Sequence, residues 1–308
     1  MQYRQLRYFI KIVEAGSFSR AAATIHVAQP ALSQQVAKLE EELGQKLLHR
    51  THRGVQPTPA GQVLYDRGSL ILRQLDELPG MLTASTGEIS GTVSLGIVAS
   101  LADVLIGPVI EHFKSALPKV LLKCSDGDSK TLAMRVQEHK LDLAVIFEHD
   151  FGPTVSRTPI FSQRLFLIGK KLPRQPRSSI SLEEIARLPL VLPGRGNERR
   201  RLIDHAFAEL ELVPNVIAEA DNLSSELSAV RTGIGHTMLN IGVLTGKGHE
   251  ALAAPVLIEP PISMICSVIQ SGDFCLSAPG EAVRKSTVEL IRTFVTKTAR
   301  PGAELIGL

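Results

Sequence analysis

Residues 18–43 read FSRAAATIHVAQPALSQQVAKLEEEL, and they predict two short helices joined by a tight turn. We expect Ser19 to cap the first helix, which carries a run of alanines and ends near His26. Pro30 suits the first position of the second helix, because the N–H that proline lacks would have no partner there. The stretch therefore predicts a helical hairpin whose second helix has a defined start.

The second helix has two contrasting faces. Its apolar residues recur at spacings of four, three and four, which predicts one buried stripe: Leu32, Val36, Leu39 and Leu43. The opposite face carries short polar groups and then a cation: Pro30, Ser33, Gln34 and Lys38. A helix-turn-helix needs this design, because its second helix packs behind and reads base edges in front. A helical hairpin within an ordinary all-α domain is the alternative.

The composition is that of an ordinary globular protein. A chain of 308 residues suggests two or three domains, and 44% hydrophobic with 21% charged residues gives no sign of disorder. The net charge of +3 is only mildly basic. Cations nevertheless outnumber anions in residues 1–60, as attraction to phosphate requires.

Several function classes lack their sequence signals. No stretch approaches the roughly 20 apolar residues of a membrane span, and the N-terminus lacks a signal peptide, so we expect a cytoplasmic protein with no membrane partner. Three scattered cysteines predict no disulfide framework; buried reduced thiols are expected, with a redox pair of Cys266 and Cys275 as the alternative. The sequence contains no catalytic or phosphate-binding motif in the strand and helix setting that such a motif requires. We therefore expect no catalytic residue, no metal and no cofactor.

A basic segment follows the second helix. Residues 49–57 carry Arg50 and turn at Arg53-Gly54, which predicts a short β-hairpin. Directly after such a helix a basic hairpin is a wing, and Arg53 at its tip would enter a minor groove or hold a phosphate. A solvated surface loop is the alternative.

Residues 1–66 resemble the winged helix-turn-helix of LysR-type transcriptional regulators. The motifs AGSFSRAA (15–22), AQPALSQQ (28–35), RGV (53–55) and PTPAG (57–61) occur in the order and spacing of that family. The segments AQPALSQQVAKLE and RTHRGVQPTPAG are similar to those of its nitrogen-assimilation-control branch. One position departs from the pattern, because many members have arginine where this chain has Gln34.

The resemblance implies a sequence-specific regulator that binds double-stranded operator or promoter DNA. Side chains at the start of the second helix would touch base edges, where glutamine can pair with adenine. Lys38 would hold a phosphate, and Arg53 would reach the adjacent groove. The expected DNA-contacting residues are Ser19, Gln29, Pro30, Ala31, Ser33, Gln34, Lys38, Arg50, Arg53 and Gly54.

Residues 59–90 predict a long linker helix and a hinge. We expect Thr58 to cap the helix and Pro59 to open it. A heptad rhythm then predicts pairing with a second copy, through Leu64, Gly68, Ile71, Leu75, Leu78 and Leu82. Pro79-Gly80 interrupts this seam, so we expect the helix to kink or end there. A helix lying on its own domain is the alternative to a homodimer, or to the homotetramer that the resemblance also implies.

From residue 91 the pattern changes to alternating strands and helices. The expected strands are 92–98, 120–127 and 141–147, and the expected helices are 103–117 and 129–139. This βαβαβ order predicts a mostly parallel sheet with helices on both faces. The theme repeats with strands at 164–170, 189–194, 216–221 and 261–271 and with helices at 198–210, 224–232 and 279–298.

These later segments look like the co-inducer domain of the same family, which is similar to a periplasmic binding protein. The expected fold class is α+β multidomain: a winged helix-turn-helix (1–58), a linker helix with hinge (59–90) and a two-lobed α/β effector-binding domain (91–308). Lobe I would comprise about 91–161 and 267–308, and lobe II about 162–266. A small-molecule co-inducer would control the binding and bending of the operator, and RNA polymerase is a further candidate partner.

Three predicted loops meet at the crevice between the lobes, where such folds bind small molecules. The guanidinium of Arg195 suits a carboxylate, although a plain surface turn explains Gly-Arg-Gly as well, and Phe147 indicates a less charged ligand. Residues 199–201 are expected to form a solvated helix face. The expected effector-binding residues are Ser100, Ser129, Thr131, Phe147, Arg195 and Asn197, of which the resemblance implies Ser100, Ser129 and Asn197.

The sequence thus predicts a ligand-responsive transcription factor rather than an enzyme. A pure solute-binding protein is a third class, and the predicted wing argues against it. The expectation of a carboxylate effector rests on Arg195 and on the helix start at Ser129, where backbone N–H groups face an anion.

Overall fold

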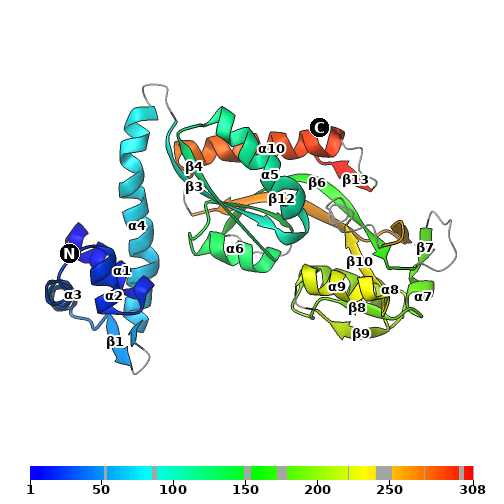
Figure 1. The fold of residues 1–308 in the computed structure, drawn as a ribbon, viewed down its shortest axis with the longest axis horizontal. Coiled ribbons are helices and arrows are strands. Elements are labelled where there is room, and N and C mark those ends of the chain that lie inside the picture. Colours follow the sequence, from blue (N-terminus) through cyan, green and yellow to red (C-terminus); the bar gives the residue numbers. More distant parts are fainter. Residues whose placement is uncertain are drawn as a thin grey trace. The chain divides into compact units, whose positions relative to one another are not determined.

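The computed structural model describes residues 1–51, 54–84, 89–148, 154–171, 179–220, 222–240, 252–273, 275–297 and 302–307. The chain forms two compact units, Met1–Glu88 and Ile89–Leu308, named unit 1 and unit 2 (Figure 1). None of the described helices is both long and apolar enough to cross a lipid bilayer.

Unit 1 is a helix-turn-helix with a hairpin and one long helix. Three helices come first: α1 (Tyr3–Ala15), α2 (Phe18–Thr24) and α3 (Gln29–Leu43). Strands β1 (Leu48–Thr51) and β2 (Gly54–Pro57) pair antiparallel, and α4 (Pro59–Ala84) follows. The predicted helical hairpin and the β-hairpin after it are confirmed.

The turn between α1 and α2 corrects one predicted cap. The side chain of Ser17, and not that of Ser19, accepts a hydrogen bond from the Arg20 N–H, at 3.5 Å. Because α2 starts at Phe18, Ser19 already lies inside the helix, where it is exposed. Helix α3 starts at Gln29, so Pro30 takes its second position rather than its first.

The apolar stripe of α3 is buried except at its end. Leu32, Val36 and Leu39 lie in the core of unit 1 together with residues of α1 and α2. Leu43, which was predicted to join them, is 41% exposed. It is the last residue of α3, and Gly44 directly after it has a left-handed backbone that turns the chain away.

The hairpin is held against the turn between α1 and α2 by close backbone contact. The N–H of Val55 donates to the carbonyl oxygen of Gly16 at 2.9 Å. A Cβ atom at Gly54, whose φ is +119°, would lie 2.5 Å from that same oxygen. Only glycine therefore fits at the start of β2.

Helix α4 begins as predicted but does not end as predicted. Thr58 Oγ1 accepts a hydrogen bond from the Gly61 N–H at 2.9 Å, and Pro59 is the first helical residue. The helix then continues through Pro79 to Ala84, so of the two predicted alternatives, a kink or an end, the end is wrong. A proline removes one backbone hydrogen bond from a helix, and the neighbouring bonds can still carry the helix onward.

The predicted apolar seam of α4 is divided into two parts. Gly68 is buried, and a Cβ atom there would meet a side chain of α1 at 2.6 Å, so the first part packs within unit 1. Ile71, Leu75 and Leu78 are 45%, 43% and 48% exposed. The side chain of Leu82 lies outside the described residues. The second part of the seam therefore leaves apolar surface uncovered within the unit.

Unit 2 is built on one large mixed sheet with the strand order β4-β3-β5-β12-β6-β11-β7; β10 and β13 also pair with β6. Its first elements are β3 (Gly91–Val98), α5 (Ala99–Ala116), β4 (Val120–Gly127), α6 (Ser129–Gln137) and β5 (Leu143–Phe147). Strands β4 and β5 both pair parallel with β3, which confirms the predicted βαβαβ order. Helix α5 begins at Ala99 rather than at 103, so Ser100 lies in its first turn and not in a loop.

Two long strands make the sheet mixed rather than mostly parallel. Strand β6 (Val155–Ile168) begins well before the predicted 164 and pairs antiparallel with β12 (Ser263–Ser271). Farther along, β6 pairs with β10 (Thr237–Asn240) and β11 (Val256–Glu259). The remaining elements are β7 (Ser179–Ser181), α7 (Leu182–Ile185), β8 (Leu190–Leu192), α8 (Glu198–Glu209), β9 (Val216–Glu219), α9 (Leu223–Thr232), α10 (Ala278–Lys297) and β13 (Ala303–Leu305).

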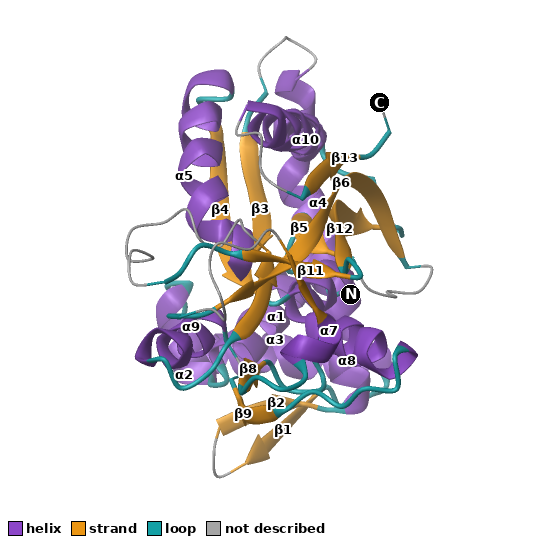
Figure 2. Cartoon of the chain, turned by 90° about the vertical axis from the view of Figure 1, so that its right-hand side faces the viewer, coloured by secondary structure: helices purple, strands orange, loops and turns teal. Residues whose placement is uncertain are grey.

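The elements of unit 2 gather in two lobes. Lobe I holds β3, β4 and β5, with α5 and α10 on one side of these strands and α6 on the other (Figure 1). Lobe II holds α7, α8 and α9 with the small β8–β9 sheet (Figure 2). Because β6 pairs with strands of both lobes, it connects them directly.

Candidate DNA-binding face and effector cavity

The side chains predicted to read DNA lie on the face of α3 that the core leaves uncovered. Pro30, Ala31, Gln34 and Lys38 are exposed, and Gln29 and Ser33 are half-buried. Within the described part of unit 1, Ser33 and Gln34 make no side-chain hydrogen bond. The N-cap residue Ala28 offers no side-chain acceptor to the first N–H groups of α3. This end of the helix thus presents donors and acceptors that have no partner among the described residues of unit 1.

The other predicted DNA contacts lie outside α3. Ser19 is exposed on α2, and Gly54 starts β2 against the Gly16 carbonyl. Arg53 and the side chain of Arg50 lie outside the described residues. Their assignment therefore still rests on the sequence.

Glu40 connects α3 to the hairpin, a role that the sequence did not predict. Its Oε1 accepts hydrogen bonds from the N–H groups of Leu47 and Leu48, at 2.9 and 3.3 Å, and its Oε2 accepts one from Lys46 Nζ at 2.7 Å. Burial by itself raises the pKa of the Glu40 carboxyl, but the Lys46 ammonium and the two N–H groups lower that pKa by more. Glu40 is thus a carboxylate that fixes the start of the hairpin on α3.

Unit 2 contains a cavity of about 300 Å³ between its lobes. Residues at the starts of α5, α6, α8 and α9 line it, so four helix N-termini converge on one space. Unpaired N–H groups and the helix dipole make each such end favourable for an anion. The cavity therefore places four helix N-termini beside charged side chains of both signs in its lining: Asp126, Asp128, Glu198, Glu226, Lys130 and Arg199.

Four of the six predicted effector-binding residues line this cavity: Ser100, Ser129, Phe147 and Asn197. Ser129 Oγ accepts a hydrogen bond from the Phe147 N–H at 3.2 Å, so the hydroxyl proton of Ser129 can be given to a ligand. Asn197 caps α8, since its side chain accepts a hydrogen bond from the Arg199 N–H at 2.9 Å.

The other two predicted residues do not line the cavity. The N–H and Oγ1 of Thr131 donate to Asp128 at 2.9 and 2.6 Å, so Thr131 serves the local cap of α6 and is exposed. Arg195 is also exposed, because it lies in the turn closed by the Asn197 N–H and the Gly194 carbonyl, outside the lining of the cavity. The plain-turn alternative describes this segment better than a guanidinium in the site.

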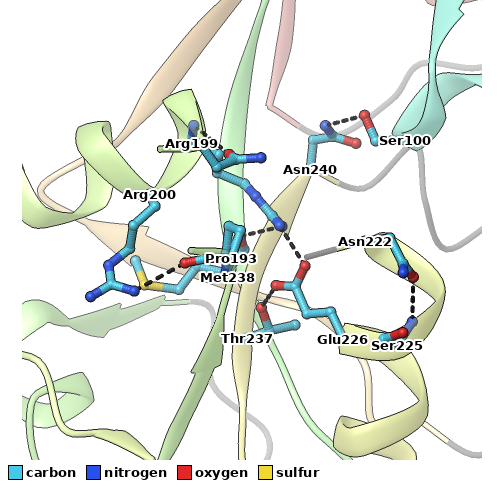
Figure 3. A network of polar contacts seen from close by, with 11 residues as sticks. Ser100, Pro193, Arg199, Arg200, Asn222, Ser225, Glu226, Thr237, Met238 and Asn240 are labelled. Carbon is cyan, nitrogen blue, oxygen red and sulfur yellow. Dashed lines mark hydrogen bonds and ion pairs between the residues drawn. The ribbon is translucent and has the colours of Figure 1, made fainter. Parts of the chain in front are cut away.

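Two of the arginines expected on a solvated helix face are instead built into lobe II. Arg199 lines the cavity, donates to Glu226 at 2.5 Å and to the Met238 carbonyl at 3.1 Å (Figure 3). Glu226 is 1% exposed and also accepts a hydrogen bond from Thr237. Arg200 is buried and donates to Asp204 at 2.8 Å and to Glu219 at 3.1 Å; only Arg201 is exposed, as expected.

The sequence did not predict several further residues that line the cavity, notably Arg199, Asn222, Glu226 and Asn240. Asn222 caps α9, and Asn240 is the last residue of β10. Arg199 and Glu226 are 27 residues apart in the sequence, so no local pattern identifies them as partners.

The cysteines offer no shared site. Cys266 is buried, which raises the pKa of its thiol, whereas Cys275 is exposed rather than buried as expected. Neither forms a disulfide. Among the described residues, no cluster of three or more His, Cys, Asp or Glu side chains is arranged to hold a metal ion.

Comparisons with known proteins agree with both units. The family described as "Bacterial regulatory helix-turn-helix protein, lysR family" matches residues 3–62, and "LysR substrate binding domain" matches residues 86–288. The nitrogen assimilation regulatory protein nac of Escherichia coli (strain K12) is 33% identical, over 94% of this chain and 95% of its own length. These relatives are transcriptional regulators and not enzymes.

Solved structures share the fold. Full-length OxyR from Pseudomonas aeruginosa, in a variant form, has a TM-score of 0.74 at 22% identity and covers 95% of each chain. Full-length CbnR in complex with its target DNA has a TM-score of 0.70 at 19% identity, over 94% of this chain and 99% of that one. With a regulator at 33% identity over nearly its whole length and a family match across residues 86–288, the chain belongs to the LysR family of bacterial transcriptional regulators.

Proposed function

We propose that this regulator binds a dyad-symmetric operator as a homodimer. We further propose that a small anionic effector in the cavity of unit 2 controls how the regulator binds the operator. The observation that carries the proposal is the face of α3, which keeps Ser33 and Gln34 unbonded in the described part of unit 1 while Glu40 fixes the hairpin beside it. Regulation of chromosomal operators implies work in the cytoplasm, where RNA polymerase is a further partner.

The proposed contacts to DNA are of two kinds: some recognise a base, and others bind the phosphate backbone or the neighbouring groove. Gln34, exposed on α3, can pair with an adenine through both ends of its amide, and Ser33 beside it can donate or accept. Lys38, the uncapped start of α3 and Arg53 of the hairpin supply positive charge or N–H groups to phosphates and the neighbouring groove. The complex of CbnR with its target DNA supports this use of the fold.

The second part of the α4 seam supports the homodimer. Ile71, Leu75 and Leu78 are exposed at heptad spacing, and a second copy of the helix would cover them. One α3 reads about one half-site, so pairing two copies fixes the spacing of two half-sites along the duplex. Two such dimers would give a homotetramer.

The cavity supports a small effector with a carboxylate. Its volume of about 300 Å³ suits a molecule of a few carbon atoms, and the helix starts supply N–H groups for negative charge. The hydroxyls of Ser100 and Ser129 add neutral donors at two of these starts. Binding that favours one arrangement of the lobes would shift the regulator between two DNA-bound states.

Selection of genomic fragments by the purified full-length protein tests the DNA-binding part of the proposal. The retained fragments should share a dyad-symmetric motif, and the genes beside them would indicate the pathway of the effector. Retention of unrelated fragments, with no common motif, would contradict sequence-specific operator binding.

A further inference from the structure

Asn240 is a buried polar residue of the cavity wall whose side chain is only half bonded. It ends β10, lines the cavity and is 2% exposed. Its Nδ2 donates to Ser100 Oγ across the lobes, at 3.4 Å, which is long for such a bond (Figure 3). Among the described residues, none gives a hydrogen bond to its Oδ1.

An unbonded amide oxygen inside a protein destabilises the fold, because the oxygen has lost its water and gained no donor in return. An apolar side chain of the same size, such as leucine, would avoid this loss at the same position. The short strand β10 carries apolar Met238 and Leu239 directly before Asn240, so the local pattern does not call for an amide. A donor supplied by a bound molecule would satisfy the free oxygen.

The rest of the cavity lining can bind an anionic group at the other end of such a molecule. Four acidic side chains line the cavity, and two of them form ion pairs: Glu198 with Arg201 and Glu226 with Arg199. Of the other two, Asp126 and Asp128, the latter accepts hydrogen bonds from the neutral N–H and hydroxyl of Thr131. The two ion pairs compensate Glu198 and Glu226, and the Lys130 ammonium in the lining offsets part of the charge of Asp126 and Asp128. Helix α5 has no side-chain cap, so its first N–H groups remain for an anionic group. The cavity thus offers anion-binding ends together with one buried acceptor.

We propose that Asn240 is a specificity-determining residue whose Oδ1 accepts a hydrogen bond from an amine or hydroxyl group of the effector. The effector is then a small carboxylic acid that carries such a donor, rather than a plain carboxylate. This inference rests on the proposed effector site and adds the chemical class of its ligand.

Three four-carbon diacids that differ at one carbon atom test the inference. Succinate carries only hydrogen there, L-malate carries a hydroxyl, and L-aspartate carries an ammonium group. Calorimetric titration of the full-length protein should show malate or aspartate binding about 3 to 10 times more tightly than succinate, the range expected for one hydrogen bond. The tighter of the two identifies the donor as hydroxyl or ammonium.

Two variants connect the preference to Asn240. Asn240→Leu keeps the size of the side chain and removes the acceptor, so the affinity ratio should fall to about one. Asn240→Asp keeps an acceptor, adds a negative charge and should favour aspartate over succinate more strongly than the wild type does. Asn215→Leu is the matched control, because Asn215 is exposed in lobe II and does not line the cavity.

Equal affinity for the three acids, an unchanged ratio in Asn240→Leu, or no binding of any of them would overturn the role of Asn240. A Ser129→Ala variant separates this failure from failure of the effector site. If all three acids bind and Ser129→Ala weakens each to a similar extent, the proposed site stands without Asn240. If Ser129→Ala leaves all three affinities unchanged, the acids bind elsewhere and both the site and the inference fail.

Discussion

The carboxylate of Glu40 accepts a hydrogen bond from the backbone N–H of Leu47, at 2.9 Å, and so ties the last turn of α3 to the residue directly before β1 of the wing. The same carboxylate receives the Leu48 N–H and the Lys46 ammonium. Two elements that would contact DNA at different places are thereby held in one arrangement. Orientation of the wing is set by this side chain as well as by the backbone contact at Gly16.

Replacement of Glu40 by alanine should loosen the wing. The Leu47 and Leu48 N–H groups lose a charged acceptor, which is expected to cost about 1.5–3 kcal/mol of local stability. Native-state hydrogen exchange of these two amides measures the loss directly. Glu41→Ala is the control, because Glu41 is exposed on the same helix; equal exchange rates in the two variants would contradict the tether.

The tether should also weaken in acid. The pKa of Glu40 lies below its usual 4.5 in the folded chain, so its stabilisation is complete above that pH and is lost as the pH falls through the lowered pKa. Urea midpoints measured from about pH 7 down to about pH 3 should therefore converge for the wild type and Glu40→Ala. A constant difference across this range would show that the charge of Glu40 is not involved.

Gln34→Ala should relax base preference at one position of the operator half-site. Losing a two-bond contact to a base costs about 1–3 kcal/mol of discrimination. Binding-site selection with the variant measures this change, with Gln62→Ala on α4 as the exposed control. The same motif from wild type and Gln34→Ala would show that Gln34 does not read a base.

Leu75→Asp should separate the two copies of α4. Leu75 is 43% exposed in the middle of the uncovered seam, so a carboxylate there would be buried against the partner helix. Sedimentation equilibrium should give a dimer dissociation constant at least about tenfold higher than that of the wild type. Gln74→Asp changes the neighbouring exposed position and should leave the dimer intact; an equal effect of both variants would contradict the seam.

Arg199→Ala should destabilise unit 2 far more than Arg201→Ala. The first variant leaves Glu226, which is 1% exposed, without its ion-pair partner, and such a loss costs about 3–5 kcal/mol. The second removes a pair in which Arg201 is 58% exposed, worth at most about 1 kcal/mol. Thermal unfolding followed by circular dichroism compares them, and similar midpoints would place the Arg199–Glu226 pair among ordinary surface pairs.

Most of unit 1 could be predicted because its signals are local. The heptad spacing, the Thr58 cap and the turn at Arg53-Gly54 each act within a few residues, and the family motifs fix their order. The errors there are also local: two serines flank Phe18, and the structure uses Ser17 rather than Ser19 as the cap. Leu43 was misplaced because periodicity does not show where the covering helices stop.

The cavity was harder to predict because sequence-distant residues form it. Ser129 and Asn197 lie at helix starts, which are a local property of the sequence, and the family resemblance implied them as site residues. Arg199 and Glu226 come from different helices, α8 and α9, and their contact depends on how the fold brings these helices together beside β10, where the Met238 carbonyl also accepts from Arg199. Asn240 carries no sequence signal at all, since its proposed role depends on an oxygen to which none of the described residues donates a hydrogen bond.

Hydroxyl-radical footprinting of the full-length protein on a selected operator tests the central claim most directly. A dimer that reads DNA through α3 and the wing of each subunit should protect two half-sites on one face of the duplex, one helical turn of about 10 base pairs apart or a multiple of it, related by a dyad. A single protected site without dyad symmetry, or protection that is unchanged on unrelated sequences, would contradict it.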